Sequence, residues 1–200
     1  MRRTVLKLLL AGAMAIAGSG TALAQDAADE NILLLNIASN SGDEIGTVEI
    51  ELFAEKSPGH VDRIKQLARA GAYDDVVFHR VIDGFMVQTG DVQFGTRTAF
   101  ADGRAGMGGS DMPDLAAEFS DISHEEGIVS MARAQNPNSA NSQFFIMLAH
   151  VNQLDGQYSV FGKVLSGMEH VHAIKKGSRS QNGAVAEPDY IASARIKSDG

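Results

Sequence analysis

The sequence predicts a mainly β fold in one domain, an antiparallel barrel or sandwich. Short runs of strand length recur along the chain, and only two segments have the apolar spacing of a helix. A parallel sheet would need a helix between most strands, so the strands are expected to be antiparallel. With 200 residues, of which 44% are hydrophobic and 21% charged, the chain can bury the core of one domain.

The first two strands are predicted to form a hairpin. Residues 31–38 are a nearly continuous apolar run, which is typical of a buried strand. Residues 47–53 alternate between apolar and polar side chains, so one face of that strand is expected to be buried. The polar residues 39–43 between the two runs fit a connecting turn.

A helix is predicted over residues 58–70. Ser57 suits the N-cap, and Pro58 suits the first helical position, where its missing N–H has no helical partner. Gly71 can end the helix. The apolar face consists of Val61, Ile64, Leu67 and Ala68, while the residues off that face are Asp62, Arg63, Lys65 and Arg69.

The rest of the chain completes the mainly β pattern. A second helix is predicted over 168–176, and strands are predicted over 76–82, 85–89, 127–131, 143–148, 158–164 and 190–196. Residues 92–117 are rich in Gly, Asp and Ala and lack periodicity, so we expect a long surface loop, which in a compact domain is often functional.

The N-terminus has the three parts of a secretory signal peptide. Basic residues precede an apolar run that is shorter than a membrane span, and small residues end it at Ala24. We expect cleavage after Ala24, a periplasmic product without stable membrane insertion, a flexible leader over 25–30 and the folded domain over 31–200. Arg2 and Arg3 leave open whether the general secretory or the twin-arginine route is used.

The charge of the mature chain excludes some partners. Cleavage would leave 14 basic and 25 acidic residues and a net charge of −11, which argues against binding nucleic acid or an anionic membrane. The sequence contains no cysteine, so no disulfide can contribute to stability in an oxidising compartment. We expect a monomer.

Two predicted strands carry amide and cationic side chains among apolar ones. Alternation places Met86 and Gln88 on one face of their strand, and it places Gln143 on the same face as Phe145. Arg80 lies in the strand just before them. The simplest interpretation makes the apolar residues core and Arg80 a surface charge.

Four motifs in register resemble the cyclophilin-type peptidyl-prolyl cis/trans isomerases. They are FHRVIDGFMVQTGD at 78–91, SMARA at 130–134, NSQFFI at 141–146 and LDGQYSVFGKV at 154–164. The resemblance spans residues 30–196 and is greatest to the bacterial secreted branch. It implies an eight-stranded, closed antiparallel barrel capped by two helices, an isomerase of X-Pro bonds, and unfolded or partly folded proline-containing polypeptides as substrates.

The resemblance also assigns roles to single residues. It places the catalytic arginine at Arg80, the proline pocket at Phe85, Met86, Phe145 and Leu154, and the substrate-binding groove at Gln88, Ala132, Arg133 and Gln143. Two positions depart from many members: Gln153 replaces a tryptophan, which should weaken cyclosporin binding, and Tyr158 replaces a frequent histidine in the wall of the proline pocket.

An arginine suits this reaction because no bond is broken. Rotation about the peptide bond costs about 18–20 kcal/mol, since the nitrogen lone pair is delocalised into the carbonyl. In the twisted transition state the lone pair returns to nitrogen, which then accepts a hydrogen bond well, so a guanidinium donor favours that state over both planar forms. Neither a metal nor a cofactor is needed.

Other sites are weaker interpretations of the sequence. The six histidines include no HExxH pair, residues 103–110 lack the Lys of a phosphate-binding loop, and neither Ser130 nor Ser142 sits in a GxSxG elbow. Two rival functions remain. The first is a module that binds proline-containing peptides without catalysis. The second is a barrel that carries a small apolar ligand, but bulky side chains should fill the interior of an eight-stranded barrel and leave no space for one.

Overall fold

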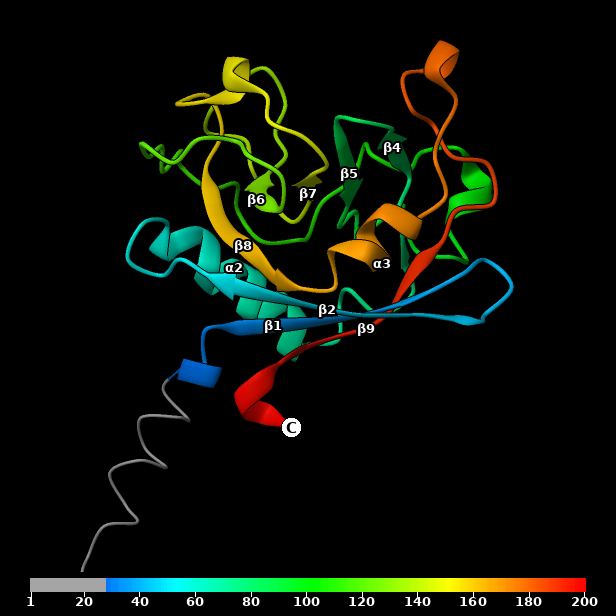
Figure 1. Ribbon diagram of the computed structural model, residues 1–200, viewed down its shortest axis with the longest axis horizontal. Coiled ribbons are helices and arrows are strands. Elements are labelled where there is room, and N and C mark those ends of the chain that lie inside the picture. Colours follow the sequence, from blue (N-terminus) through cyan, green and yellow to red (C-terminus); the bar gives the residue numbers. More distant parts are fainter. Residues whose placement is uncertain (1–27) are drawn as a thin grey trace, which may run out of the picture.

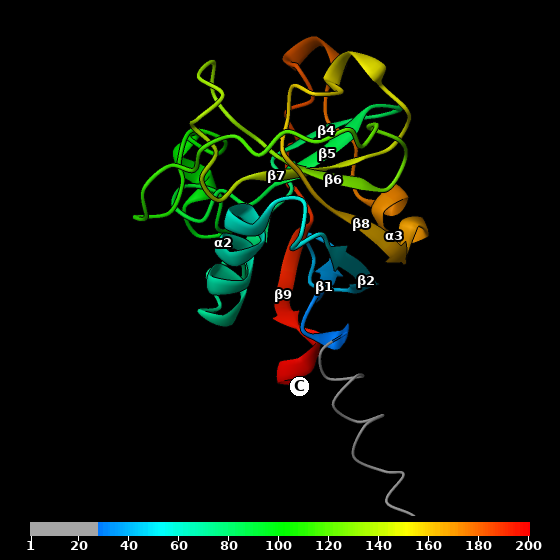
Figure 2. The ribbon, with the colours of Figure 1, turned by 90° about the vertical axis from the view of Figure 1, so that its left-hand side faces the viewer.

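The computed structural model describes residues 28–200, and its strands form one curled antiparallel sheet (Figure 1). The strands are β1 (Ile32–Ala38), β2 (Glu44–Leu52), β3 (Val76–Val77), β4 (Arg80–Ile82), β5 (Met86–Thr89), β6 (Ile128–Met131), β7 (Phe144–Met147), β8 (Val160–Ser166) and β9 (Tyr190–Ile196). Their order in the sheet is β3-β9-β1-β2-β8-β6-β7-β5-β4. Helices α2 (Pro58–Arg69) and α3 (Met168–Ala173) lie on opposite sides of it (Figure 2).

The predicted mainly β fold with two helices is confirmed, but the barrel is an open half-barrel of nine strands rather than a closed barrel of eight. The difference arises in the predicted strand 76–82, which divides into β3 and β4. Between them, Phe78 donates its N–H to the carbonyl of Asp189, and the carbonyl of His79 accepts from Val185. Because the C-terminal segment takes these backbone groups, β3 pairs with β9 and β4 with β5, at opposite ends of the sheet.

The other predicted elements agree with the structure within a few residues. The predicted hairpin is the antiparallel pair β1 and β2, although β2 begins at Glu44, three residues early, because Ala38 pairs with Glu44 across a bulge. Helix α3 ends at Ala173 rather than 176. The segment 92–117 is a loop that contains one short 3-10 helix, Phe100–Asp102.

Helix α2 begins and ends where the sequence predicts, but its N-terminal cap comes from elsewhere in the chain. Ser57 donates its hydroxyl to the carbonyl of Val160, at 2.6 Å, rather than capping the helix. Glu118 instead accepts the N–H groups of Gly59 and His60, at 3.1 and 3.2 Å. Arg63, predicted off the apolar face, is buried, and its guanidinium donates to two backbone carbonyls.

Strand alternation divides the apolar side chains between two clusters. On β7, Phe144 and Ile146 point into the main core, which β1, β2, β9 and α2 complete. Phe144 packs edge to face against Tyr73 and Phe161, with ring centroids 5.6 and 5.9 Å apart, so bulky side chains fill the interior. Phe145 and Met147 belong to a second cluster on the opposite face of the sheet.

The predicted signal peptide and its cleavage site after Ala24 lie outside the described residues, as does the first half of the leader, residues 25–27. Glu30, the last residue of the predicted leader, accepts hydrogen bonds from Lys65 and Arg69 on α2, at 3.1 and 2.7 Å. Within residues 28–200, the helices are too short or too polar to cross a membrane.

Candidate active site

Three neighbouring strands bring the predicted polar residues together. In the register of the sheet, Arg80 on β4 lies opposite Gln88 on β5, and Gln88 lies opposite Phe145 on β7. Directly opposed residues project from the same face, and Met86, two residues before Gln88, shares that face. This face of the sheet therefore presents a guanidinium, an amide and two apolar side chains next to one another.

The guanidinium of Arg80 is held in a defined orientation. Its Nε donates to the backbone carbonyl of Asn182 at 3.0 Å, its Nη2 donates to Oδ1 of the same residue at 3.1 Å, and its Nη1 donates to Oε1 of Gln88 at 3.1 Å. An arginine has five N–H donors, so one remains on each terminal nitrogen. The remaining donor on Nη1 has only the weakly accepting sulfur of Met86 near it, at 3.9 Å.

Asn182 is a site residue that no motif in the sequence predicts. This residue has a positive φ of 53°, which places both its carbonyl and its side-chain oxygen on Arg80. The Asn182-Gly183 pair is a turn signal, and asparagine is among the few residues that adopt this conformation readily. Nothing in the sequence indicates that this turn meets a strand 102 residues earlier.

Nine of the ten predicted site residues line one pocket of about 110 Å³. At about 30 Å³ for a water molecule, this is room for three or four waters, or for a five-membered ring. The predicted apolar residues form the walls, and Arg80 and Gln88 lie at the polar rim. The lining residues are Arg80, Phe85, Met86, Gln88, Ala132, Arg133, Phe145, Leu154 and Tyr158.

Ring contacts fix two walls of the pocket. Phe145 packs edge to face against Tyr158, with centroids 5.4 Å apart and planes at 87°. The guanidinium of Arg133 lies over the Tyr158 ring at 4.6 Å and donates twice to the carbonyl of Gln157. A cation over a ring face is attracted to it, so Arg133 helps to hold Tyr158 in place.

A chain of hydrogen bonds through the buried His124 and Ser130 supports Phe145 from behind. Asp155 lies 3.0 Å from Nδ1 of His124, and Nε2 of His124 lies 3.0 Å from the hydroxyl of Ser130. The His124 ring stacks on Phe145 at 6.3 Å. Although a hydroxyl, an imidazole and a carboxylate in this order resemble a hydrolase triad, Ser130 has no exposed surface, so its hydroxyl cannot reach a substrate in this structure.

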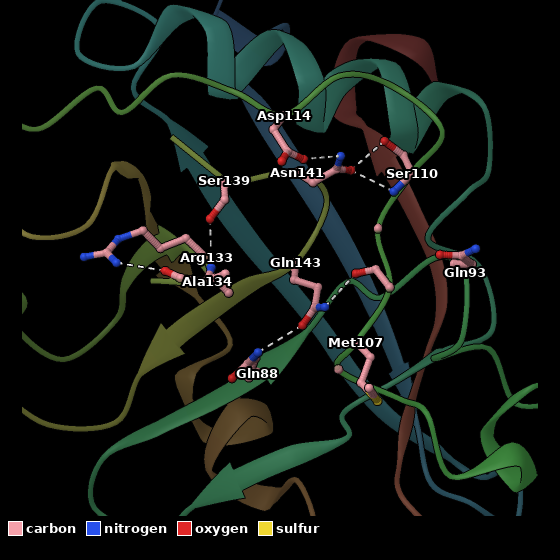
Figure 3. Close-up of a pocket in the computed structure, with 14 residues that line it drawn as sticks. Gln88, Gln93, Met107, Ser110, Asp114, Arg133, Ala134, Ser139, Asn141 and Gln143 are labelled. Carbon is pink, nitrogen blue, oxygen red and sulfur yellow. Dashed lines mark hydrogen bonds between the residues drawn. The ribbon is translucent and has the colours of Figure 1, made fainter. Parts of the chain in front are cut away.

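Gln143, the tenth predicted residue, connects the first pocket to a second of about 440 Å³ (Figure 3). Its Oε1 accepts a hydrogen bond from Nε2 of Gln88 at 3.0 Å, and its Nε2 donates to the carbonyl of Gly108 at 2.8 Å. Residues 106–110, from the glycine-rich stretch of the long loop, form the opposite wall. Gln88, Ala132, Arg133 and Gln143 therefore lie along a groove between the pockets.

Arg80 and Arg133 are the two cationic residues that line the pocket. Burial lowers the pKa of the Arg80 guanidinium from the ordinary value, yet an arginine keeps its proton at neutral pH. The neighbouring His79 is buried, and burial lowers its pKa to about 4. His79 is therefore neutral at pH 7 and adds no further positive charge beside Arg80.

The alternative sites of the sequence analysis find no further support. Ser142 is buried and donates its hydroxyl to the carbonyl of Gly90 at 2.7 Å. Among residues 28–200, no group of three histidine, aspartate or glutamate side chains lies close enough together to hold a metal ion.

Comparisons with known proteins identify the fold and the family. A family model for the cyclophilin type peptidyl-prolyl cis-trans isomerases matches residues 34–196. A probable peptidyl-prolyl cis-trans isomerase of Brucella suis is 51% identical over 193 residues, which cover 96% of this chain and 95% of the relative. Peptidyl-prolyl cis-trans isomerase-like 3 of Gallus gallus is 39% identical over 134 residues, 66% of this chain and 78% of the relative.

Solved structures show the same architecture. Cyclophilin AquaCyp293 from Hirschia baltica superimposes with a TM-score of 0.70 at 25% identity, over 92% of this chain and 83% of that one. A Cryptosporidium parvum cyclophilin, solved in the presence of the dipeptide Ala-Pro, gives 0.69 at 26% identity, over 82% of this chain and 98% of that one. The fold is the half-barrel of a cyclophilin-type isomerase. The chain belongs to the cyclophilin-type peptidyl-prolyl cis-trans isomerases and is an enzyme of that class.

Proposed function

We propose that Arg80 is the catalytic residue of this isomerase and that the adjoining apolar pocket binds the prolyl ring of an X-Pro bond. One observation carries the proposal: three hydrogen bonds orient the Arg80 guanidinium at the rim of a pocket that is large enough for a five-membered ring. The C. parvum cyclophilin was solved with Ala-Pro, which supports a proline-containing ligand for this chain as well.

The pocket and the guanidinium act together on the twisted amide. Phe85, Met86, Phe145 and Leu154 hold the ring, so the carbonyl side of the bond turns while the nitrogen stays in place. As the nitrogen lone pair localises, a free N–H of Arg80 donates to it, and this hydrogen bond is stronger in the transition state than in either planar form. Gln88 and Gln143 bind the neighbouring backbone, as do Ala132 and Arg133.

The size of the effect matches this chemistry. Each ~1.4 kcal/mol of preferential transition-state binding accelerates rotation tenfold. A pre-oriented donor in a partly dry site contributes roughly 2.7–4 kcal/mol, as measured for single donors of oxyanion holes. Fixing the ring contributes the rest, because it removes the freedom of one side of the bond before rotation begins.

The cis-to-trans rate of a short X-Pro peptide tests the proposal. We expect the protein without residues 1–24 to accelerate exchange by orders of magnitude, and Arg80→Ala to lose most of that acceleration while remaining folded. If the unsubstituted protein binds the peptide without accelerating exchange, it is a binding module and the mechanism is wrong.

We further propose that the protein acts in the periplasm, as a monomer, on secreted proteins that fold there. The support is the signal-peptide pattern of residues 1–24 and the acidic mature chain, which would not adhere to anionic membranes. Cell fractionation with mass spectrometry of the N-terminus tests this. A mature chain that begins at Gln25 in the periplasmic fraction is expected, and an uncleaved cytoplasmic chain would refute the proposal.

A further inference from the structure

A buried carboxylate outside the pocket is held by backbone groups from two places in the chain. Asp91, directly after β5, has no exposed surface. Its Oδ1 accepts the N–H groups of Gln93 and Phe94, at 3.1 and 2.8 Å, which forms a local turn. Its Oδ2 accepts those of Gly106 and Gly108, at 2.7 and 3.0 Å, and so holds the long loop that forms one wall of the second pocket.

The loop is shaped to reach this carboxylate. Gly106 has a φ of +93°, a conformation that side chains of other residues rarely adopt. A Cβ on Gly108 would lie only 2.5 Å from Oδ1 of Asp91 and 2.8 Å from the Phe94 ring. Glycine at these two positions lets the peptide N–H groups approach Oδ2 closely.

A directed chain of hydrogen bonds leads from this loop to Arg80, and Figure 3 shows its link between Gln143 and Gln88. The carbonyl of Gly108 accepts from Nε2 of Gln143, at 2.8 Å, and Oε1 of Gln143 accepts from Nε2 of Gln88, at 3.0 Å. Oε1 of Gln88 accepts from Nη1 of Arg80, at 3.1 Å. Together with the hydrogen bond from Gly108 N–H to Asp91, the chain joins a buried carboxylate to the guanidinium through two side-chain amides and the backbone of one residue, Gly108.

The groups along this series of hydrogen bonds determine how each side-chain amide is oriented. Arginine can only donate, so Gln88 must turn its oxygen to Arg80 and its NH₂ to Gln143. Gln143 must then turn its NH₂ to Gly108. At the other end, Oδ2 of Asp91 accepts the N–H groups of Gly106 and Gly108 and so holds the loop backbone on both sides of residue 107. Each amide has one satisfied orientation, and the position of the Gly108 carbonyl determines where Gln143, Gln88 and finally Nη1 of Arg80 lie.

We propose that Asp91 is a positioning residue of the isomerase, which sets the direction of the Arg80 donor through Gly108, Gln143 and Gln88. The proposal rests on the catalytic role proposed for Arg80. If the donor is misaligned, the transition state loses its hydrogen bond while the apolar pocket still binds the prolyl ring. Loss of Asp91 should therefore lower kcat and leave KM nearly unchanged.

The variant Asp91→Asn tests the proposal because an asparagine has only one accepting oxygen. That oxygen can keep the local turn with Gln93 and Phe94, and the NH₂ then faces the N–H groups of Gly106 and Gly108, which releases the loop. We expect kcat for an X-Pro peptide to fall at least tenfold, with KM within a factor of two.

Asp189→Asn is the matched control. Asp189 is also buried, and its two oxygens accept the backbone N–H groups of Asn40 and Lys175, at 3.1 and 2.8 Å. Its side chain takes no part in the chain to Arg80. We expect Asp189→Asn to keep kcat within a factor of two, measured where urea titration shows both variants fully folded. An equal fall in kcat for both variants would overturn the proposal.

A double-mutant cycle tests whether the effect passes through Gln143. If it does, Asp91→Asn should lower kcat by less than a factor of two in a Gln143→Leu background, whereas independent effects would multiply. NMR gives a second readout: the side-chain amide signal of Gln88 should shift in Asp91→Asn, although the two residues share no hydrogen bond. If the effects of the two substitutions on kcat multiply and the Gln88 signal does not shift, the proposal is refuted.

Two further measurements separate the possible failures. If Asp91→Asn does not fold, Gly108→Ala displaces the same loop from the carboxylate, and the same fall in kcat is expected. If Arg80→Ala keeps full activity, the proposed catalytic role fails. The Gln88 amide signal then still reports whether Asp91 controls the hydrogen-bond chain.

Discussion

Arg80→Lys separates the charge of the proposed catalytic residue from its geometry. Lysine keeps the positive charge but replaces the planar fork with one nitrogen on a flexible stem. In the structure the fork spans Asn182 on one side and Gln88 on the other, with three hydrogen bonds of 3.0–3.1 Å. A single ammonium group cannot satisfy both partners and also present a donor to the prolyl nitrogen.

The magnitude follows from the loss of one positioned donor. Removing such a donor from a pre-organised site costs about 2.7–4 kcal/mol, or 10²–10³ in rate. We expect Arg80→Ala to lower kcat/KM by about that factor. The kcat/KM of Arg80→Lys should be less than tenfold higher than that of Arg80→Ala. The half-buried position also disfavours the charged ammonium group and lowers its pKa.

The assay is the cis-to-trans exchange of an X-Pro peptide, followed over substrate concentration so that kcat and KM are obtained separately. Because Arg80 lies at the rim of the pocket and outside the main core, both variants should keep the free energy of unfolding within about 1 kcal/mol. A folded Arg80→Lys with the activity of the unsubstituted protein would show that charge alone suffices and would refute the role of the oriented fork.

Three further predictions concern pH and ligands. Burial lowers the pKa of His79 to about 4, so the unfolded chain binds a proton on this residue at a higher pH than the native protein does. The free energy of unfolding should therefore fall by about 3 kcal/mol from pH 6.5 to pH 4. Urea titrations at several pH values should show this fall, and His79→Phe should abolish it. Burial of Glu118 raises its pKa, but hydrogen bonds from His60 and Gly59 outweigh burial and lower the pKa below its ordinary value. Glu118→Gln should therefore lower the free energy of unfolding by about 1 kcal/mol at pH 7. The difference in unfolding free energy between the variant and the unsubstituted protein should disappear as the pH falls below about 4.5. Gln153→Trp should tighten cyclosporin inhibition measured in the exchange assay.

The residues of the pocket could be predicted because strand alternation is a local rule. Phe144 and Ile146 on β7 point into the main core, and Phe145 points to the opposite face, as the sequence indicates. Gln143, directly before β7, follows the same alternation and contacts Gln88, which lies opposite Phe145. The motifs supplied the roles that alternation alone leaves open, since Arg80 could equally have been a surface charge. Alternation accounts for the pocket residues on strands, whereas five of the nine lie outside the strands and were predicted from the motifs: Phe85, Ala132, Arg133, Leu154 and Tyr158.

The remaining features depend on contacts between distant segments, and no local pattern encodes them. The cap of α2 comes from Glu118, about 60 residues after the helix begins, although Ser57 has the right chemistry and position for a cap. Likewise, the break between β3 and β4 exists because Asp189 and Val185 take the backbone groups of Phe78 and His79. A sequence pattern shows which groups need partners, and only the fold decides which partners they obtain.

The same distinction explains why a triad-like arrangement occurs in an enzyme that breaks no bond. A hydrolase needs an exposed hydroxyl that can attack, but Ser130 is covered and His124 stacks on the wall of the proline pocket. Rotation about an amide needs a ring that does not move and a donor that points in one direction. The chain from Asp155 to Ser130 stabilises the wall formed by Phe145, and the hydrogen bonds of Arg80 orient the donor. In both places, hydrogen bonds supply the rigidity that this reaction needs, because the donor must keep its direction and the ring must stay in place while the amide bond rotates.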